Sequence, residues 1–172
     1  MCIGPDVMIE AARGGDGADT LGGNRGNNVL NGDDGNDRLH GREGHDRLYG
    51  SAGHDLLVGG KGRDRLYGSE GHDRFDFNAL SESGRTAKTR DQIMDFERGV
   101  DVIDLRSIDA KAGGNDGFKF VKAAAFKGAG QLRIKDLGSD VIVQADVNGD
   151  RKSDFEILVR KVNTLTSSDF LF

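Results

Sequence analysis

Residues 41–58 read GREGHDRLY-GSAGHDLLV, which is two successive copies of one nine-residue unit. The unit recurs seven times without a gap across residues 14–76. Its fourth position is always glycine, its sixth is aspartate except for Asn28, and its eighth is leucine except for Phe75. A fixed period of this length indicates a repeat architecture in which each unit packs on its neighbours. The units begin at Gly14, Gly23, Gly32, Gly41, Gly50, Gly59 and Gly68.

Each unit predicts a glycine-rich turn of six residues followed by a strand of three. Glycine and aspartate suit the turn, because glycine reaches positive φ without a Cβ clash. In the strand, the eighth side chain points inward while the seventh and ninth point outward. If successive strands lie on opposite faces of a flattened coil, two units, or 18 residues, complete one turn. Units two apart then stack directly on each other.

The sixth-position side chains indicate a ligand between the stacked turns. One large apolar side chain per unit buries too little surface to offset the conformational entropy of ordering the coil. Carboxylates repeated every ~4.8 Å would also repel one another. A divalent cation between turns replaces that repulsion with coordination, and oxygen ligands without sulfur suit Ca²⁺. The stacked columns are Asp19, Asp37, Asp55 and Asp73 on one edge, and Asn28, Asp46 and Asp64 on the other.

These units resemble the hemolysin-type calcium-binding repeats of RTX proteins. The resemblance implies a mostly all-β fold, a parallel β-roll solenoid that binds Ca²⁺ at about five inter-turn sites. It implies that first- and third-position carbonyls and sixth-position side chains hold the metal. Asn28 departs from the pattern and marks the weakest site, and the second positions Asn24, Asp33, Arg42, Ser51 and Ser69 are not glycine. The implied ligands are Gly14, Asp16, Asp19, Asn28, Gly32, Asp34, Asp37, Gly41, Glu43, Asp46, Gly50, Ala52, Asp55, Gly59, Lys61, Asp64, Gly68 and Asp73.

Residues 77–172 lose the glycine period and predict a small β-rich cap that closes the open end of the solenoid. Two segments, Ser107–Lys111 and Ala123–Phe126, predict short helical turns. The domain division expected is a lead-in at 1–13, the repeats at 14–76, and the cap at 77–172. The predicted strands of the cap are Gln92–Phe96, Val100–Leu105, Phe118–Val121, Leu132–Ile134, Val141–Ala145 and Phe155–Val159.

The cap resembles the C-terminal region of serralysin-type metalloproteases. The matching stretches are Ser81–Ser83, Asp95–Phe96, Gly99–Leu105, Asp146–Asp150 and Thr164–Phe170. Upstream, Ile9–Gly15 resembles the joint between the catalytic domain of that family and its roll. The resemblance covers about residues 8–172 and only the non-catalytic half of the family.

The chain ends Asp169-Phe170-Leu171-Phe172, an acidic residue followed by hydrophobic ones. This ending resembles uncleaved type I secretion signals, so we expect a secreted, extracellular protein. An ordinary final strand is the alternative. No N-terminal stretch has the pattern of a secretory signal peptide, and the single cysteine, Cys2, cannot form an internal disulfide.

Composition and motifs exclude several function classes. The net charge of −5 argues against a nucleic-acid binder, and no apolar run approaches the length of a membrane span. The four histidines, His40, His45, His54 and His72, lie in the repeats, and none forms the His-Glu-x-x-His motif of a zinc protease. We therefore predict a non-catalytic calcium-binding module. Whether the chain is complete, or is the C-terminal half of a secreted zinc metalloprotease, stays open.

Three further features have two interpretations each. Stacked His54 and His72 are either exposed turn residues or part of an adventitious metal site. The loop Asp146–Asp154 is a polar hairpin turn or a calcium loop with EF-like spacing, although Ile157 stands where an EF loop has glutamate. On one outward face, arginines and tyrosines either form a solvated surface or grip an acidic polysaccharide, as in the repeat modules of alginate epimerases. These four residues are Arg47, Tyr49, Arg65 and Tyr67. A spacer role in a surface or matrix protein is a further class.

Overall fold

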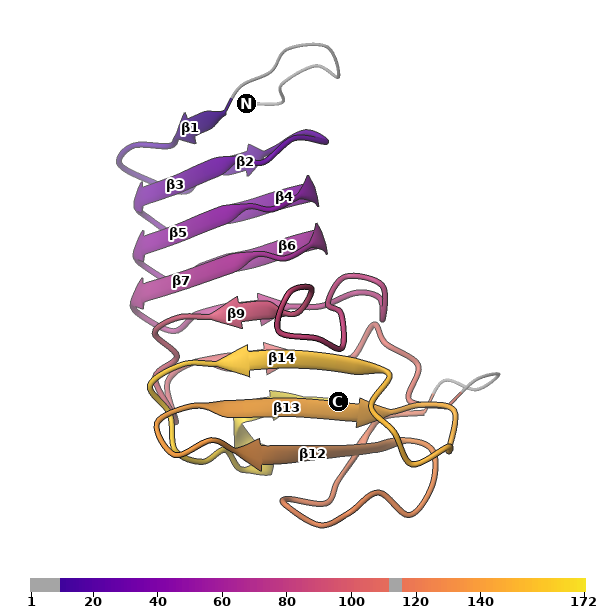
Figure 1. Cartoon of the computed structure of the whole chain (residues 1–172). Helices are drawn as coiled ribbons and strands as arrows, with labels where there is room; N and C mark the ends of the chain where they lie inside the picture. Colours follow the sequence, from indigo (N-terminus) through magenta and orange to yellow (C-terminus); the bar gives the residue numbers. More distant parts are fainter. Residues whose placement is uncertain (1–9, 112–115) are drawn as a thin grey trace.

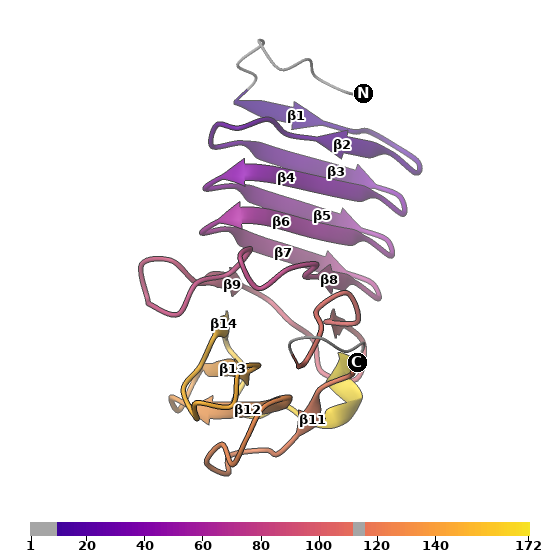
Figure 2. The same ribbon diagram turned by 90° about the vertical axis from the view of Figure 1, so that its right-hand side faces the viewer.

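The computed structural model describes residues 10–111 and 116–172, which form two β-sheets facing each other (Figures 1 and 2). The larger sheet has the order β1 (Ala11–Arg13), β3 (Val29–Asp34), β5 (Arg47–Ala52), β7 (Arg65–Glu70), β9 (Asp91–Ile93), β14 (Phe155–Val159), β13 (Val141–Asp146), β12 (Gln131–Asp136) and β11 (Lys119–Phe120). The smaller has the order β15 (Phe170–Leu171), β10 (Val102–Asp104), β8 (Arg74–Asp76), β6 (Leu56–Gly62), β4 (Arg38–Gly44) and β2 (Thr20–Gly22).

The repeats form the predicted parallel β-roll, with 18 residues per coil. Leu30 pairs with Leu48 and Leu48 with Leu66 in one sheet, while the other sheet aligns the even-numbered strands in the same way. The eighth-position side chains fill the space between the sheets and are at most 4% exposed. This register confirms the fold class, because a shift by one residue would move the leucines to solvent.

The strands are longer than the three residues predicted. Strands β3, β5 and β7 each continue through the third position of the following unit, so Asp34 pairs with Ala52 across β3 and β5. The second position has positive φ in this extension, 69° at Asp33 and 84° at Ser51. Because identical turns stack in register, their backbones keep exchanging hydrogen bonds beyond the apolar positions. In the larger sheet the turn is therefore only positions four to six, and in the smaller sheet β4 and β6 include the fourth position as well.

The cap continues the roll before it changes character. Strand β9 pairs in parallel with β7, and β10 pairs in parallel with β8, so both sheets run on past residue 76. Strand β14 still pairs with β9 in parallel, but the next two pairs, β14 with β13 and β13 with β12, are antiparallel. All six predicted strand segments contain or overlap an observed strand, although the bounds differ by up to three residues at an end.

The two predicted helical turns do not develop into helices. In Ser107–Lys111 and Ala123–Phe126 the described backbone forms only single turns, with Ile108 donating to Leu105 and Ala124 to Val121. The 3₁₀-helix η1 instead covers Ser167–Asp169, where the sequence pattern predicted none. It leads into β15, which pairs with β10 and completes the smaller sheet. Among the described residues, no helix has the length and apolarity to cross a membrane.

Candidate metal centre

The sixth-position side chains form two hydrogen-bonded columns, as their spacing predicts. In each column, the backbone N–H of one member donates to Oδ1 of the member one coil later, over 2.7 to 3.0 Å. The odd column, named for units one, three, five and seven, is Asp19, Asp37, Asp55, Asp73 and Asp101. The even column, from units two, four and six, is Asn28, Asp46, Asp64 and Asp91.

The second carboxylate oxygen of most column members has no partner. Within the described residues, these Oδ2 atoms are buried and make no hydrogen bond. A buried polar atom without a partner is costly, and an ionised one more so. These oxygens recur in line along each edge of the roll, which points to a cation as their partner. The residues concerned are Asp37, Asp46, Asp55, Asp64, Asp73 and Asp91.

First-position glycines bring backbone carbonyls close to the same oxygens. A Cβ built on Gly32 would collide with Asp37 Oδ2 and would lie 2.7 Å from the carbonyl oxygen of Gly50. A Cβ on Gly50 would likewise meet Asp55 Oδ2, with the Gly68 carbonyl 2.8 Å away. Two oxygens from consecutive coils therefore converge on one small space that only glycine leaves open. Several oxygens around one point are the donor set that Ca²⁺ takes.

Burial disfavours the charged form of these carboxylates when no metal is bound. Desolvation raises the pKa of Asp46 to about 6, and the pKa values of Asp64 and Asp73 to about 7. It also raises the pKa of Asp91 well above its usual value, with the neighbouring Asp64 charge adding to the effect. A cation at the convergence point would reverse these shifts by favouring the ionised form.

The third-position carbonyls accept backbone hydrogen bonds between consecutive coils. In the odd units, the carbonyl oxygens of Asp34 and Ala52 accept N–H groups of Gly17 and Gly35 at 2.5 and 2.7 Å. Each of these carbonyls keeps a second lone pair. The side chains of Asp16, Asp34, Glu43 and Lys61 are exposed, so these residues could contribute through the backbone alone. Among the described residues, no three His, Cys, Asp or Glu side chains gather into a metal cluster.

Asn28 differs from the aspartates of its column. Its Oδ1 accepts the backbone N–H of Asn24 at 2.8 Å, which closes its own turn. Its backbone N–H still donates to Asp46 Oδ1. The residue thus keeps the column in register while offering an amide in place of a carboxylate.

Two column members, Asp91 and Asp101, were missed by the repeat analysis. Asp64 donates its N–H to Asp91 Oδ1 at 2.7 Å, and Asp73 donates to Asp101 Oδ1 at 3.0 Å. Their spacings from the preceding member are 27 and 28 residues, because the segment between β8 and β9 interrupts the period. The signal was the tripeptide pattern Asp-x-Ile at 91–93 and 101–103, which matches positions six to eight of the unit.

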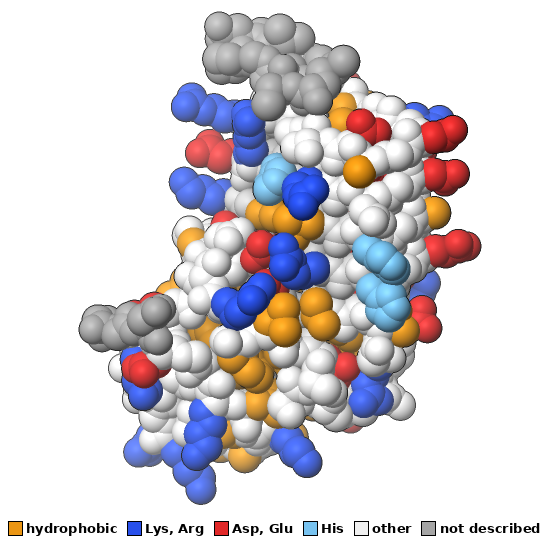
Figure 3. Space-filling view, turned by 180° about the vertical axis from the view of Figure 1, so that it is seen from behind, with side chains coloured by type: hydrophobic (Ala, Val, Ile, Leu, Met, Phe, Trp, Pro, Cys, Tyr) orange, Lys and Arg blue, Asp and Glu red, His pale blue; other side chains and the backbone are white. Residues whose placement is uncertain are grey.

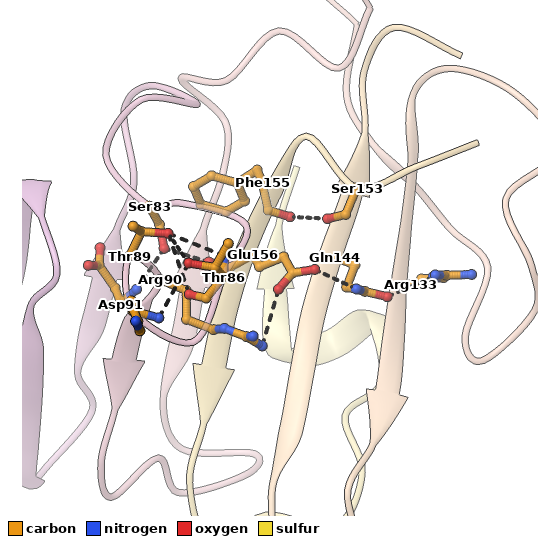
Figure 4. A network of polar contacts seen from close by, with 11 residues as sticks. Ser83, Thr86, Thr89, Arg90, Asp91, Arg133, Gln144, Ser153, Phe155 and Glu156 are labelled. Atoms are coloured by element: carbon orange, nitrogen blue, oxygen red, sulfur yellow. Dashed lines mark hydrogen bonds and ion pairs between the residues drawn. The ribbon is translucent and has the colours of Figure 1, made fainter. Parts of the chain in front are cut away.

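A polar network fixes Asp91 between the roll and the cap (Figure 4). The Asp91 N–H donates to Ser83 Oγ at 2.8 Å, and Ser83 Oγ donates to the Glu156 carbonyl oxygen at 2.5 Å. The Glu156 carboxylate pairs with Arg90 at 3.1 Å and accepts from Gln144 at 2.6 Å. The cap strands β13 and β14 therefore position the last member of the even column.

The structure favours the plain interpretation of two other candidate sites. His54 and His72 are neighbours, but His54 Nδ1 accepts the His72 N–H at 2.8 Å, so its proton lies on Nε2 and no lone pair is left for a metal. In the β13–β14 hairpin, Asp146 accepts N–H groups of Gly149 and Arg151, and Asp154 accepts those of Val147 and Asn148. These carboxylates stabilise the turn itself.

The outward arginines and tyrosines stack as their positions predict. Arg47 lies opposite Arg65, and Tyr49 opposite Tyr67, across strands β5 and β7. The two tyrosine rings are parallel to within 16°, with centroids 4.5 Å apart.

Comparisons with known proteins agree with this architecture. Among solved structures, the AlgE6R2 subunit of the mannuronan C5-epimerase from Azotobacter vinelandii is 26% identical, with a TM-score of 0.62 and 92% of each chain covered. The AlgE6R3 subunit of the same enzyme is 26% identical over 98% of this chain and 83% of that one, with a TM-score of 0.46. No curated protein matches the sequence.

The sequence also matches one protein family along its whole length. The family is described as Peptidase M10 serralysin C terminal, and the match spans residues 1–172. It describes the region of these peptidases that lies outside their catalytic domain. With its parallel β-roll and its aspartate columns, the chain belongs to the serralysin C-terminal family.

Proposed function

We propose that the chain is a non-catalytic module that binds Ca²⁺ between stacked turns and folds when it does so. The observation that carries this proposal is the column of buried Oδ2 atoms without hydrogen-bond partners. Binding free energy at such sites becomes folding free energy, because the unfolded chain holds no preformed site.

The proposed ligands come from two consecutive coils at each site. Asp37 and Asp55, for example, supply carboxylates, and the first-position carbonyls of Gly50 and Gly68 add backbone oxygens. When bound, Ca²⁺ supplies the positive charge that lets the buried carboxylates ionise together. The repeats alone give five intervals between stacked side chains, each a proposed site. Asp91 and Asp101 add one interval to each column, so the odd column has four and the even column three.

We further propose export through a type I system before folding. The serralysin family is a secreted one, and Ca²⁺ is scarce in the cytosol and abundant outside. A roll that stays unfolded without Ca²⁺ would pass an export channel and fold on arrival. The hydrophobic ending Phe170–Phe172 is the proposed signal.

A calcium titration followed by circular dichroism tests the main proposal. Excess chelator should abolish the β signal of the repeats, and Ca²⁺ should restore it. Mg²⁺ should substitute poorly, because it requires octahedral geometry at about 2.1 Å and loses its water reluctantly. A roll that keeps its signal in excess chelator would overturn the proposal.

A second candidate function is the binding of an acidic polysaccharide by Arg47, Tyr49, Arg65 and Tyr67. Their alignment across β5 and β7 supports it, and so does the similarity to a subunit of a mannuronan C5-epimerase. A glycan-binding screen with and without Ca²⁺ tests it. Binding that ignores Ca²⁺, or no binding at all, would count against it.

The family also supports a third possibility, in which the chain is the C-terminal half of a secreted zinc metalloprotease. The DNA upstream of Met1 tests this directly. An in-frame His-Glu-x-x-His motif would support it, and a stop codon in that frame would contradict it.

A further inference from the structure

A basic hollow lies at the edge of the larger sheet, where the turns of the even units lead into β5 and β7. Its volume is about 240 Å³. Four of its residues are cationic, whereas one is acidic. We call it the basic hollow; its lining is Asn27, His45, Asp46, Arg47, Arg63, Arg65 and Lys88.

Within the described residues, the four cations of this hollow form no ion pair, although the buried Asp46 carboxyl group also lines it. Among the described residues, none of the four lies within 4.0 Å of an acidic side chain. Arg47 and Arg65 are direct cross-strand partners, an arrangement that repels when like charges face each other. An anion held between them would remove that repulsion.

Beside the smaller sheet, two arginines share one carboxylate, whereas Arg38 and Arg42 on β4 form no ion pair within the described residues. There Arg74 and Arg106 both approach Asp104, at 3.9 and 2.7 Å. Figure 3 views the molecule from behind and shows basic and acidic side chains interspersed on that face. What distinguishes the basic hollow is that four cations gather around one carboxylate, whereas the equivalent hollow beside the smaller sheet has two arginines and two carboxylates.

Hydrogen bonds hold the floor of the hollow in place. Asn27 Oδ1 accepts the His45 N–H at 2.6 Å, and His45 Nδ1 accepts the Arg63 N–H at 2.9 Å. With the Gln92 amide turned so that both groups are satisfied, the Arg63 guanidinium donates to its side-chain oxygen. A preorganised cation needs less ordering when it binds an anion.

The two tyrosines offer less ring surface to a sugar chain than their alignment suggests. Their rings stack on each other at 4.5 Å, so each covers one face of the other. Asn31 lies beside Tyr49 on its other side, and both tyrosines are half-buried. The charged contacts must come from the other side of the arginines, which is where the hollow lies.

We propose that the basic hollow binds the anionic group of an acidic sugar chain, with Arg47, Arg63, Arg65 and Lys88 as its charged contacts. This inference rests on the second candidate function, the binding of an acidic polysaccharide. It places the main contacts in the basic hollow and not at the tyrosines. The group is a carboxylate or a sulfate, since guanidinium groups bind both. A nucleic acid is disfavoured, because the chain carries a net charge of −5 and the cations are confined to one hollow.

The opposite edge of the roll provides a matched control. An equivalent hollow of about 220 Å³ there is lined by Arg38 and Arg74, but Leu56 separates them and two carboxylates, Asp37 and Asp55, also line it. Arg38 occupies the same seventh position as Arg47 and Arg65. Replacing it removes one outward arginine without touching the basic hollow.

Calorimetry of the full chain in saturating Ca²⁺ tests the inference. The probes are a galacturonate trimer, which is too short to gel with Ca²⁺, dextran sulfate, neutral dextran and duplex DNA. Arg65→Gln and Arg63→Gln should each weaken binding of an anionic sugar about tenfold. Arg38→Gln should leave it within about twofold, and neutral dextran should not bind. The carboxylated and sulfated probes identify which anionic group the hollow prefers. Circular dichroism confirms that each variant folds.

The other outcomes separate the two hypotheses. If the wild-type chain folds with Ca²⁺ but binds neither anionic sugar, the polysaccharide function itself is wrong. If it binds and both arginine variants bind equally well, the hollow is wrong while the function stands. Equal affinity for DNA would overturn the assignment to sugars.

Discussion

Six of the column aspartates use their two carboxylate oxygens differently. Asp101 is an exception, because its Oδ2 accepts the Glu97 N–H at 2.8 Å. In the six, Oδ1 accepts a backbone N–H from the coil before it and sets the register, as Asp55 does for Asp37 at 2.7 Å. Oδ2 is buried beside glycine carbonyls and keeps its lone pairs. One side chain thus links two neighbouring coils and offers an oxygen to a cation, so its loss affects both functions.

Asp55→Ala should therefore harm calcium-dependent folding more than Asn28→Ala. Asp55 lies between Asp37 and Asp73 in the odd column and belongs to two intervals, whereas Asn28 ends its column and carries no charge. The Ca²⁺ concentration at half folding should rise about tenfold or more for Asp55→Ala. Asp55→Asn, which keeps an Oδ1 acceptor, separates the hydrogen bond from the charge. Equal Ca²⁺ stoichiometry and affinity in Asp55→Ala and Asn28→Ala would refute the stacking scheme.

The chelated chain should lose stability as the pH rises from about 4 to 7. Burial raises the pKa of Asp46 to about 6 and those of Asp64 and Asp73 to about 7, against about 3.9 in an unfolded chain. The folded state then binds more protons than the unfolded state in this window, so the free energy of unfolding falls with rising pH. Ca²⁺ should reverse the trend, because it binds the ionised carboxylates.

Circular dichroism at about pH 4.5 and pH 7, with chelator and with Ca²⁺, measures this dependence. The chelated chain should have more β signal at pH 4.5 than at pH 7, where the proposal expects it to be unfolded. A chelated chain that gains stability toward neutral pH would contradict the assigned burial of these carboxylates.

At the scale of the repeat unit, glycine at position four is required by the neighbouring coil as well as by φ. Gly53 has φ of 139°, and a Cβ there would overlap the carbonyl of Gly35 one coil earlier. Gly15 has nearly the same φ, 135°, but no atom of the described residues lies within 4 Å of its Cβ position. The two residues therefore separate backbone strain from the contact between coils.

Gly53→Ala should cost clearly more stability than Gly15→Ala. Both substitutions carry the strain of positive φ, roughly 1–3 kcal/mol. Gly53→Ala adds an overlap with backbone that cannot move without separating two coils, which takes its cost beyond about 4 kcal/mol. Thermal unfolding of both variants in saturating Ca²⁺ measures the difference. Similar losses would mean that the coils are not packed as closely as the glycine contacts require.

At the scale of the whole molecule, the chain end belongs to the fold. Phe170 is 5% exposed, lies in β15 and contacts the ring of Phe120. Phe172 stacks on Phe170 but is 37% exposed. Asp169 is buried and caps η1 by accepting the Thr166 N–H at 2.6 Å. The alternative interpretation of this end as a final strand holds, since β15 forms there, and the export signal stays a prediction.

Phe172→Ser and Phe170→Ser separate the two roles of this end. Phe170→Ser should destabilise the cap by roughly 3–5 kcal/mol, whereas Phe172→Ser should cost less than about 1 kcal/mol. If the export machinery recognises the hydrophobic end, Phe172→Ser should reduce secretion from a host that has a type I secretion system. The calcium-dependent folding of this variant should stay normal. Secretion of Phe172→Ser at the wild-type level would argue against the signal.

The sequence by itself determined the roll. The period, the eighth-position leucines and the sixth-position aspartates are local and repetitive, so their register followed from counting residues. Tertiary structure alone decided three features. Asp91 and Asp101 join the columns across interrupted spacings, the cap network places Asp91, and Lys88 meets Arg63 and Arg65 at one hollow. Each of these features depends on where the segments after β8, which break the nine-residue period, rejoin the roll. The repeat period does not determine that position. Repetition makes long-range contacts predictable from short-range spacing, and where it ends, only the folded chain determines which residues meet.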